Sequence, residues 1–588
     1  MLVRMTNPTG LSASPRRRGA HWRAITIGAF ALPPIFDLLL SDKRASFHYL
    51  AADSFYYLTV ARNLVELGSP TFDEVHLTNG FHPLWQALLT GLFAAGRSVG
   101  AAESVLLSAT VVLGVLLISA GIFALARAFS DEDGRLPLLF MTLPVGLYGF
   151  AISPLWWWLD AEELFQQNRL EGSQPLYGSL WSYANGMESS ALLLMVGLLF
   201  AWYVAKPVSE RIGSAAVFGV LLAFTTFARL DHVYLPLALL LMLAARCLLR
   251  SRRDEWLAWS SMAAIFGLLL GGYMLASQWV FGSPVPVSGA LKSTFPHVTN
   301  SFPRLVAKLW NEAGTGEPWL YLAWRFTQIT FPVVMAFVFL FWVFRRSDGR
   351  RPLRLEQQRR TERLDFLLTA TALSVVVLAF SNGLFVRWGQ QGHWYFPLSV
   401  LFFGLALIRM LDERSWLRRL EAAPKARRWV VAALVALTLL TFVGLQRQPA
   451  YHLRYSEFYF DEAPRLRAFY GRERPRLLSY DDGIVAFATG FPTMSGIGLA
   501  LDIDAIPHVR NRALANLAVQ RGYDRFTSLV YIDMRELSRP GVSSDQIARW
   551  IPNKFGGLKA PDRYRFEVEY RSADGRFVIV RVGPRTDG

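Results

Sequence analysis

Charge and cysteine are both scarce in this sequence. Only 18% of the 588 residues are charged, and Cys247 is the single cysteine. One cysteine excludes an intrachain disulfide, even for a part of the chain outside the cytoplasm. The sequence also lacks an internal repeat, a phosphate-binding glycine-rich loop, a Cys/His cluster with metal-ligand spacing and a low-complexity tract. A nucleotide-driven pump is therefore not expected.

Long hydrophobic runs take the place of charge. The chain is 53% hydrophobic, its mean hydropathy is +0.27, and apolar runs of about 20 residues, the length of a membrane-spanning helix, alternate with short polar stretches. This pattern is typical of a polytopic α-helical membrane protein. We expect eleven spanning helices, near residues 24–41, 104–126, 136–155, 188–205, 212–228, 233–249, 257–280, 320–344, 365–386, 394–411 and 429–446.

The net charge of +16 is placed where it would orient helices rather than bind nucleic acid. The basic residues gather between the apolar runs, as they do in cytoplasmic loops, so we expect membrane lipids and no nucleic acid as partners. All of these basic groups lie on the same side of the membrane only if the short apolar segment 81–96 does not cross it and stays at the outer surface. They lie at 16–23, 127–135, 206–211, 246–253, 345–363 and 409–428.

This orientation divides the chain into three parts. Residues 1–23 form a basic cytoplasmic N-terminus, and the first apolar run contains Asp37 and lacks a clear cleavage site, so it is expected to be a retained helix. A transmembrane domain covers 24–446, with amphipathic helices in its first outer loop, 42–103. Residues 447–588 have a soluble composition and predict an extracytoplasmic α/β domain.

The C-terminal part carries strand and turn signals. We expect a strand at 475–480, a turn at Asp481-Asp482-Gly483 and a short helix after it. A second strand is expected at 528–533, and a hairpin pairs 566–570 with 577–582.

The unusual polar motifs all fall on the predicted outer face, at or beside helix ends. Charge is costly inside a bilayer and marks function there. The motifs centre on Asp53, Asn79 to Trp85, Asn185-Gly-Met-Glu188, Arg229-Leu-Asp231-His232, the Pro- and Gly-containing loop 284–293, and 387–395.

Asp53 is the residue best placed for acid–base chemistry. It opens a helix on which Tyr56, Tyr57 and Leu64 recur at helical spacing. A carboxylate at a partly dehydrated membrane surface has a raised pKa, which suits a general base. The alternative is a solvated acid that caps a surface helix.

Three basic side chains suit a phosphate group at the outer interface. Lys292, Arg387 and His393 are donors for phosphate or pyrophosphate, although each alone could snorkel to lipid headgroups. The tryptophans at 156–158 predict either an interfacial aromatic belt or the lining of a sugar-binding groove.

The remaining candidates have structural alternatives. Glu188 lies in the first turn of a helix, where the dipole favours an acid. His82 could satisfy backbone groups at a helix start. Arg229 and Asp231 could pair with each other.

These motifs resemble the GT-C superfamily, integral membrane glycosyltransferases that use polyprenyl-phosphate sugar donors. Their order is most similar to the terminal arabinofuranosyltransferases of cell-wall arabinan synthesis, over nearly the whole length. Two features depart from that pattern: position 52 is Ala, where a second acid is frequent, and 78–85 is not part of the arabinosyl signature. The matching motifs are Asp53-Ser-Phe-Tyr-Tyr-Leu with Ala61-Arg62-Asn63-Leu64, Gly186-Met-Glu188-Ser, Arg229-Leu-Asp231 and Ser288-Gly-Ala-Leu-Lys292.

The resemblance implies a GT-C-type enzyme of the bacterial inner membrane. It would transfer a sugar, such as a pentofuranose, from a polyprenyl-phosphate donor to an extracytoplasmic glycan, lipid or protein. Asp53 would be the base, and Lys292, with Arg387 or His393, would hold the lipid phosphate. No cofactor is expected. Metal coordination by Asp53 is the alternative to a base; it would favour a second acid nearby, and since position 52 is Ala, Glu188 is the only candidate. The residues assigned to the sugar or acceptor are Asn79, His82, Trp85, Glu188, Arg229, Asp231 and Tyr395.

Two other classes fit part of the pattern. A transporter or flippase for a lipid-linked saccharide would use the same cations and aromatic groove, but transporters often show inverted repeats and broken midplane helices. Neither is visible in this sequence. A non-catalytic assembly subunit would leave Asp53 dispensable.

Overall fold

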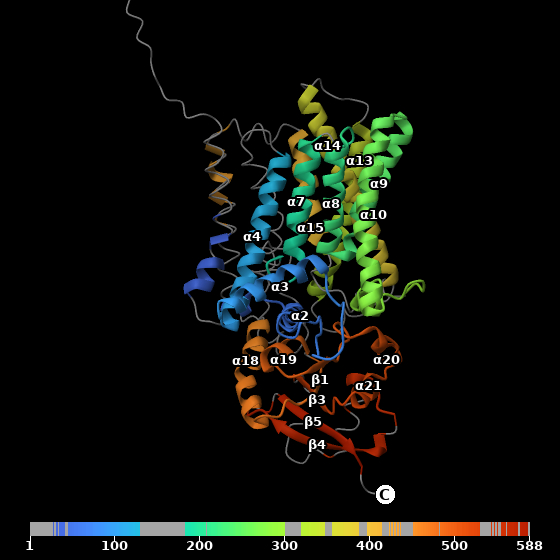
Figure 1. Ribbon diagram of the computed structural model, residues 1–588. Coiled ribbons are helices and arrows are strands. Elements are labelled where there is room, and N and C mark those ends of the chain that lie inside the picture. The colour runs from blue at the N-terminus through green and yellow to red at the C-terminus, as the bar shows by residue number, and fades with distance from the viewer. Residues whose placement is uncertain are drawn as a thin grey trace, which may run out of the picture.

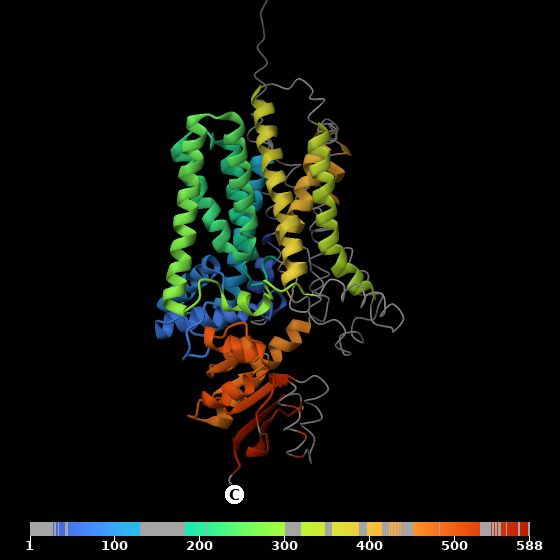
Figure 2. The ribbon, with the colours of Figure 1, turned by 90° about the vertical axis from the view of Figure 1, so that its right-hand side faces the viewer.

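The apolar runs form a long helical bundle, and a smaller α/β unit is attached to one end of it (Figures 1 and 2). The computed structural model describes residues 45–129, 183–206, 208–299, 319–346, 355–386, 397–413, 451–480, 482–529 and most of 554–585. It also describes scattered residues within 28–40, 423–436 and 543–550.

The bundle helices follow the predicted spans. The spans expected at 24–41 and 429–446 are described only in part, and the one at 136–155 lies outside the described residues. The described bundle helices are α4 (Glu103–Phe129), α7 (Ser189–Ala205), α8 (Ile212–Ala228), α9 (Tyr234–Arg250), α10 (Arg253–Phe281), α13 (Trp319–Arg346), α14 (Leu355–Phe385) and α15 (Pro397–Glu413).

Length and composition allow four of the described helices to cross a membrane. They are Glu103–Phe129, Leu230–Arg250, Arg253–Phe281 and Gln358–Phe385. Shorter apolar helices, such as Ser189–Ala205 and Ile212–Ala228, lie among them.

Helices α4 and α7 cross at glycines, so their backbones touch. A Cβ on Gly121 would lie 2.7 Å from the carbonyl oxygen of Leu193, and a Cβ on Gly197 would overlap the carbonyl oxygen of Gly121. Small residues at a crossing are typical of helices packed within a membrane, where lipid is as apolar as a side chain. The crossing fixes the start of α7, where Glu188 lies.

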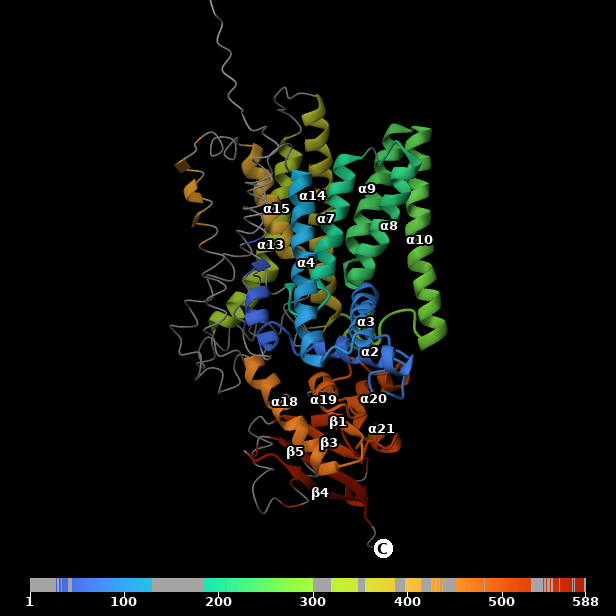
Figure 3. The ribbon, with the colours of Figure 1, turned by 60° about the vertical axis from the view of Figure 1, so that its left-hand side comes forward.

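Two further helices, α2 (Ser54–Leu67) and α3 (Pro83–Ser98), lie across the end of the bundle, between it and the C-terminal unit (Figures 1 and 3). The first ten residues of α2, Ser54 to Asn63, are all buried, because α2 has neighbours on both sides. α3 covers the short apolar segment expected at the outer surface and is not among the candidate spans of the described chain.

The C-terminal unit contains a five-stranded sheet of order β2-β1-β3-β5-β4. The strands β1 (Leu477–Ser479), β2 (Thr493–Ser495) and β3 (Arg525–Leu529) run parallel. The strands β4 (Tyr564–Arg571) and β5 (Phe577–Pro584) form an antiparallel hairpin, and β5 also pairs with β3.

The predicted strand, helix and hairpin of this unit are confirmed. Helix α19 (Asp482–Thr489) follows β1. The second strand begins at Arg525 rather than 528, because Phe526 fills the core and Arg525 Nε bonds Glu569 Oε2 of β4 at 3.0 Å. Residues 530–533 of the prediction lie outside the described residues.

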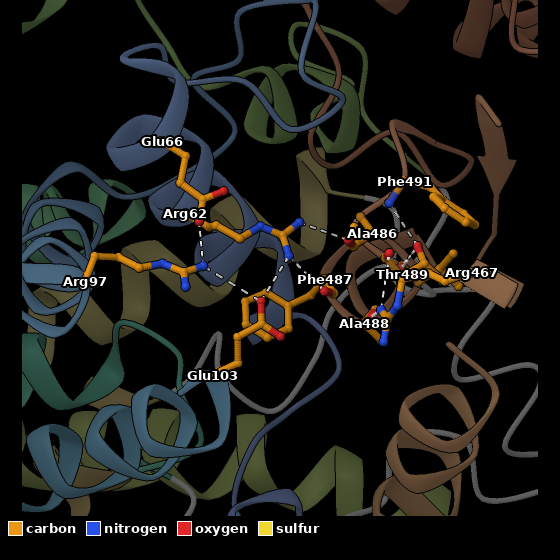
Figure 4. A network of polar contacts seen from close by, with 12 residues as sticks. Arg62, Glu66, Arg97, Glu103, Arg467, Ala486, Phe487, Ala488, Thr489 and Phe491 are labelled. Atoms are coloured by element: carbon orange, nitrogen blue, oxygen red, sulfur yellow. Dashed lines mark hydrogen bonds and ion pairs between the residues drawn. The ribbon is translucent and has the colours of Figure 1, made fainter. Parts of the chain in front are cut away.

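The C-terminal unit packs directly on α2. The rings of Phe55 and Phe487 lie 5.6 Å apart, and a Cβ on Gly483 would be 3.3 Å from the amide nitrogen of Tyr56. Arg62 donates from Nη1 to the carbonyl of Phe487 at 2.9 Å and from Nη2 to that of Ala486 at 3.0 Å (Figure 4). A cation at the C-terminal end of a helix also meets its dipole favourably. One hydrophobic core therefore extends from the bundle into the C-terminal unit, and the unit has a second core of its own.

Candidate active site

Asp53 occupies the N-cap position of α2 but does not cap it. Its backbone is helical (φ −64°, ψ −20°), and its carboxylate makes no capping hydrogen bond. Within the part of the chain that the structure describes, this carboxylate has no hydrogen-bond or ion-pair partner. The capping alternative therefore does not hold, and the oxygens of a half-buried acid are open to a substrate.

Burial raises the pKa of Asp53 to about 6, the positive charge of Lys292 opposes this rise, and the negative charge of Glu188 adds to it. The fold has thus brought together three residues from separate motifs. A carboxylate with this pKa is largely ionised at neutral pH and basic enough to take a proton from a hydroxyl group.

Lys292 ends the short helix α11 (Val287–Lys292). The next residue, Ser293, forms an isolated antiparallel bridge with Val386, and Val386 directly precedes Arg387 in the sequence. Arg387, His393 and Tyr395 themselves, like the tryptophans at 156–158, lie outside the described residues. Their assigned roles stay predictions.

Glu188 is held by side chains from three other elements. Its Oε1 accepts a hydrogen bond from Arg229 Nη1 at 2.6 Å and lies 3.6 Å from His82 Nε2. Its Oε2 accepts a hydrogen bond from the Tyr57 hydroxyl at 2.9 Å. Although Glu188 is the N-cap residue of α7, it makes no capping hydrogen bond. Its buried carboxylate instead pairs with Arg229 and accepts the hydrogen bond of Tyr57.

Arg229 joins Glu188 to Asp231. Its Nε donates to Asp231 Oδ1 at 2.8 Å and its Nη2 donates to Asp231 Oδ2 at 3.1 Å, while His232 Nδ1 lies 2.9 Å from Asp231 Oδ1. The predicted pairing of Arg229 with Asp231 is confirmed, but Arg229 also pairs with Glu188, so the contact belongs to a larger network. The guanidinium needs these partners because an unpaired buried charge would be strongly destabilising.

His82 is fixed in one tautomer. Its Nδ1 accepts a hydrogen bond from the backbone N–H of Leu230 at 3.1 Å, so the neutral ring carries its proton on Nε2, which faces Glu188. Burial lowers the pKa of His82, although the charge of Glu188 acts in the opposite direction. His82 does satisfy a backbone group, as one alternative predicted, but that group belongs to Leu230 and not to the start of α3.

The loop before α7 is pressed against α2. The amide of Ala51 donates to the carbonyl of Asn185 at 2.9 Å. Gly186 has a φ of +79°, and a Cβ there would lie 2.7 Å from the Cβ of Ser54, so this position needs glycine for conformation and for space. The carbonyl of Gly186 accepts from the indole of Trp85 at 2.9 Å. Trp85 is fully buried, and its sugar-binding role stays a prediction.

Asn79 is also engaged by the protein. Its Nδ2 donates to Ser277 Oγ at 3.0 Å and to the Val285 carbonyl at 3.1 Å, and its Oδ1 accepts from the Val287 amide at 2.9 Å. Asn79 thus connects the first outer loop to α10 and α11. In this conformation its amide is directed to protein groups rather than to a sugar.

Two members of the network were not assigned to the site from the sequence. Tyr57 lies four residues after Asp53, a spacing that puts both on one helix face, and that was the available signal. His232 directly follows Asp231, but adjacency alone does not predict the contact. Its fully buried Nε2 has no protein partner among the described residues.

No group of three or more His, Cys, Asp or Glu side chains that could hold a metal ion is found among the described residues. The expectation of a site without a metal stays a prediction. The chemistry that the described side chains offer is proton transfer by Asp53 beside the cation of Lys292, with a fixed, charge-paired network behind them.

No protein-family model and no curated protein sequence matches the chain. Among solved structures, the chain is similar to ArnT from Cupriavidus metallidurans in the apo state, with 14% identity and a TM-score of 0.50. The structure of ArnT bound to undecaprenyl phosphate has 13% sequence identity to the chain and a TM-score of 0.49. Each of the two matches covers 96% of this chain and 99% of ArnT.

The archaeal oligosaccharyltransferase AglB from Archaeoglobus fulgidus, in complex with an inhibitory peptide and a dolichol-phosphate, is a more distant neighbour. It has 12% identity and a TM-score of 0.41, over 98% of this chain and 74% of its own. At such identities a likeness concerns the fold, and the narrower resemblance to arabinofuranosyltransferases stays a prediction. The chain has the polytopic helical fold of ArnT.

Proposed function

We propose that the protein is a membrane glycosyltransferase that moves a sugar from a polyprenyl-phosphate donor to the hydroxyl group of an acceptor. The observation that carries this proposal is Asp53, a half-buried carboxylate with a pKa of about 6 on which the charge of Lys292 acts. A base beside a cation, at one end of a helical bundle, suits a lipid-phosphate substrate and a hydroxyl nucleophile. The fold shared with ArnT, which has been crystallised with undecaprenyl phosphate, supports the same class of donor.

In the proposed reaction Asp53 accepts the proton of the acceptor hydroxyl while its oxygen bonds to the anomeric carbon. The bond between that carbon and the phosphate oxygen breaks, and polyprenyl phosphate leaves with the electron pair. Lys292 stabilises the charge on this leaving group, and we assign Arg387 or His393 to the same phosphate. Base catalysis of this kind is typically worth about 10²–10⁴ in rate.

The buried network supports the base. Glu188 raises the pKa of Asp53, and Arg229, His82 and Tyr57 hold Glu188 in place. We place the reaction on the outer side of a bacterial inner membrane, with a glycan, lipid or protein as acceptor. We further propose a pentofuranose as the sugar, which follows from the arabinosyl resemblance, and Tyr395 as a sugar contact.

The test is to incubate the purified protein with a panel of pentofuranosyl and hexosyl polyprenyl phosphates and to measure free polyprenyl phosphate. Asp53→Asn keeps the size of the side chain but removes the base, so turnover should fall by about 10²–10⁴ while donor binding persists. Asp562→Asn, at an exposed site in the C-terminal unit, is the matched control.

Two results would refute this function. One is an Asp53→Asn protein that keeps more than about a tenth of wild-type turnover, since the factor expected of a base would be missing. The other is movement of labelled donor across reconstituted vesicles without release of polyprenyl phosphate, which is the behaviour of a transporter.

A further inference from the structure

The helix that carries Lys292 is held by distant parts of the chain. α11 has six residues, too few to be stable alone. Its apolar residues, Val287, Ala290 and Leu291, pack into the core of the C-terminal unit, and Arg510 donates to the carbonyl of Ala290 at 2.9 Å. The direction in which Lys292 points therefore depends on these contacts.

The polar contact at the start of α11 comes from Asn79. The first amide of a helix has no partner within it, and Pro286, the N-cap residue of α11, makes no capping bond. Asn79 Oδ1 accepts from this amide, Val287 N, at 2.9 Å. Asn79 does what an N-cap side chain normally does, but from a loop about 200 residues earlier in the chain.

The other half of the Asn79 amide fixes the segment leading into α11. Nδ2 donates to Ser277 Oγ in α10 and to the carbonyl of Val285. Ser277 itself donates to the carbonyl of Ser283 at 2.8 Å. Asn79 is 1% exposed, so water cannot replace these bonds if they are lost.

The residues on either side of Asn79 are seated on the C-terminal unit. Thr78 Oγ1 donates to the carbonyl of Leu501 at 2.9 Å, and a Cβ on Gly80 would overlap the carbonyl oxygen of Leu499. The loop that carries Asn79 is therefore anchored on the same C-terminal unit into whose core α11 packs. Asn79 links this loop directly to α11.

We propose that Asn79 is a positioning residue that caps α11 from the first outer loop and thereby fixes Lys292 opposite Asp53. This deepens the proposed function and rests on the role that it gives to Lys292. Without the cap, α11 frays at its first turn and the ammonium group samples positions away from the donor phosphate.

The experiment combines hydrogen exchange with lipid binding in the full-length protein. Asn79→Ala should raise deuterium uptake over 285–293 and weaken binding of undecaprenyl phosphate by about tenfold, the size expected for the loss of one helix cap. Asn79→Asp keeps an acceptor for the Val287 amide but loses the donor to the Val285 carbonyl, so it should lower the raised uptake only in part. Thr110→Val removes a buried hydroxyl bond of similar kind within α4, away from α11, and should leave both readouts unchanged.

The outcomes separate the two proposals. Unchanged uptake in the Asn79→Ala protein, or raised uptake with unchanged lipid binding, would overturn the positioning role. Tight binding of undecaprenyl phosphate by Lys292→Met protein, or no binding by the wild type, would instead remove the phosphate role of Lys292.

Discussion

At the scale of single residues, the protonation state of Asp53 should set the pH dependence of transfer. A base acts only when deprotonated, and burial raises the pKa of Asp53 to about 6. We therefore expect kcat/KM to rise with pH through about 6 and to level off above it. Because Lys292 holds this pKa down, Lys292→Met should move the acid limb to higher pH and weaken donor binding, and Lys292→Arg should partly restore both.

The measurement is kcat/KM from about pH 4.5 to 8.5 for the wild type and the Lys292 variants. Lys559→Met, a lysine substitution in the C-terminal unit, serves as the control and should leave the limb in place. An acid limb that does not move in the Lys292→Met protein would show that Lys292 does not act on the group that titrates.

The types of these residues could be predicted from the sequence, but their partners could not. A carboxylate and a cation at a membrane face are unusual enough to mark a site. Whether Asn79 binds a sugar or a protein group depends on Ser277 and Val285, which lie 198 and 206 residues away. A polar side chain looks the same in a sequence whether it anchors a helix or meets a ligand.

At the scale of elements, the contact between α2 and α19 should contribute more stability than the surface ion pairs beside it (Figure 4). Arg62 is 7% exposed and donates to two carbonyls of α19. Its replacement by Ala should lower the free energy of unfolding by about 2 kcal/mol or more, because hydrogen bonds to a charged group contribute about 1.5–3 kcal/mol.

Arg97→Ala is the matched control, measured by the same denaturant titration in detergent. The Arg97 side chain is 37% exposed where it pairs with Glu66, and exposed pairs contribute about 0–1 kcal/mol. Equal losses in the two variants would mean that Arg62 does not hold α19 on α2.

Helix α2 also shows where prediction from periodicity ends. Its apolar spacing correctly indicates a helix from Ser54, with one face inward. Periodicity cannot tell that the opposite face is buried as well, because its cover, α19, lies more than 400 residues further along the chain. The hairpin of β4 and β5 was predictable because its two paired strands follow one another directly in the sequence.

At the scale of the whole molecule, α2, whose N-cap residue is Asp53, lies with the sheet at one end of the bundle, while the turn between α7 and α8 lies at the other (Figures 1 and 2). From the basic loops we expect the sheet to lie outside the cytoplasm. With Cys247 replaced, Glu567→Cys on β4 should react with an impermeant maleimide in intact cells. Glu210→Cys, in the turn after α7, should react only after the inner face is opened. The reverse labelling pattern would invert the topology.

The contact between Arg62 and α19 can form only after α19 has been synthesised, long after α2. Arg62 and Ala486 are 424 residues apart, and ribosomes add about 5–20 residues per second, so roughly 20–85 s separate the two ends of this contact. During that interval the face of α2 that packs against α19 is uncovered. The segment that covers α2 is made more than 400 residues after α2 itself, so the site is not complete before α19 has been synthesised.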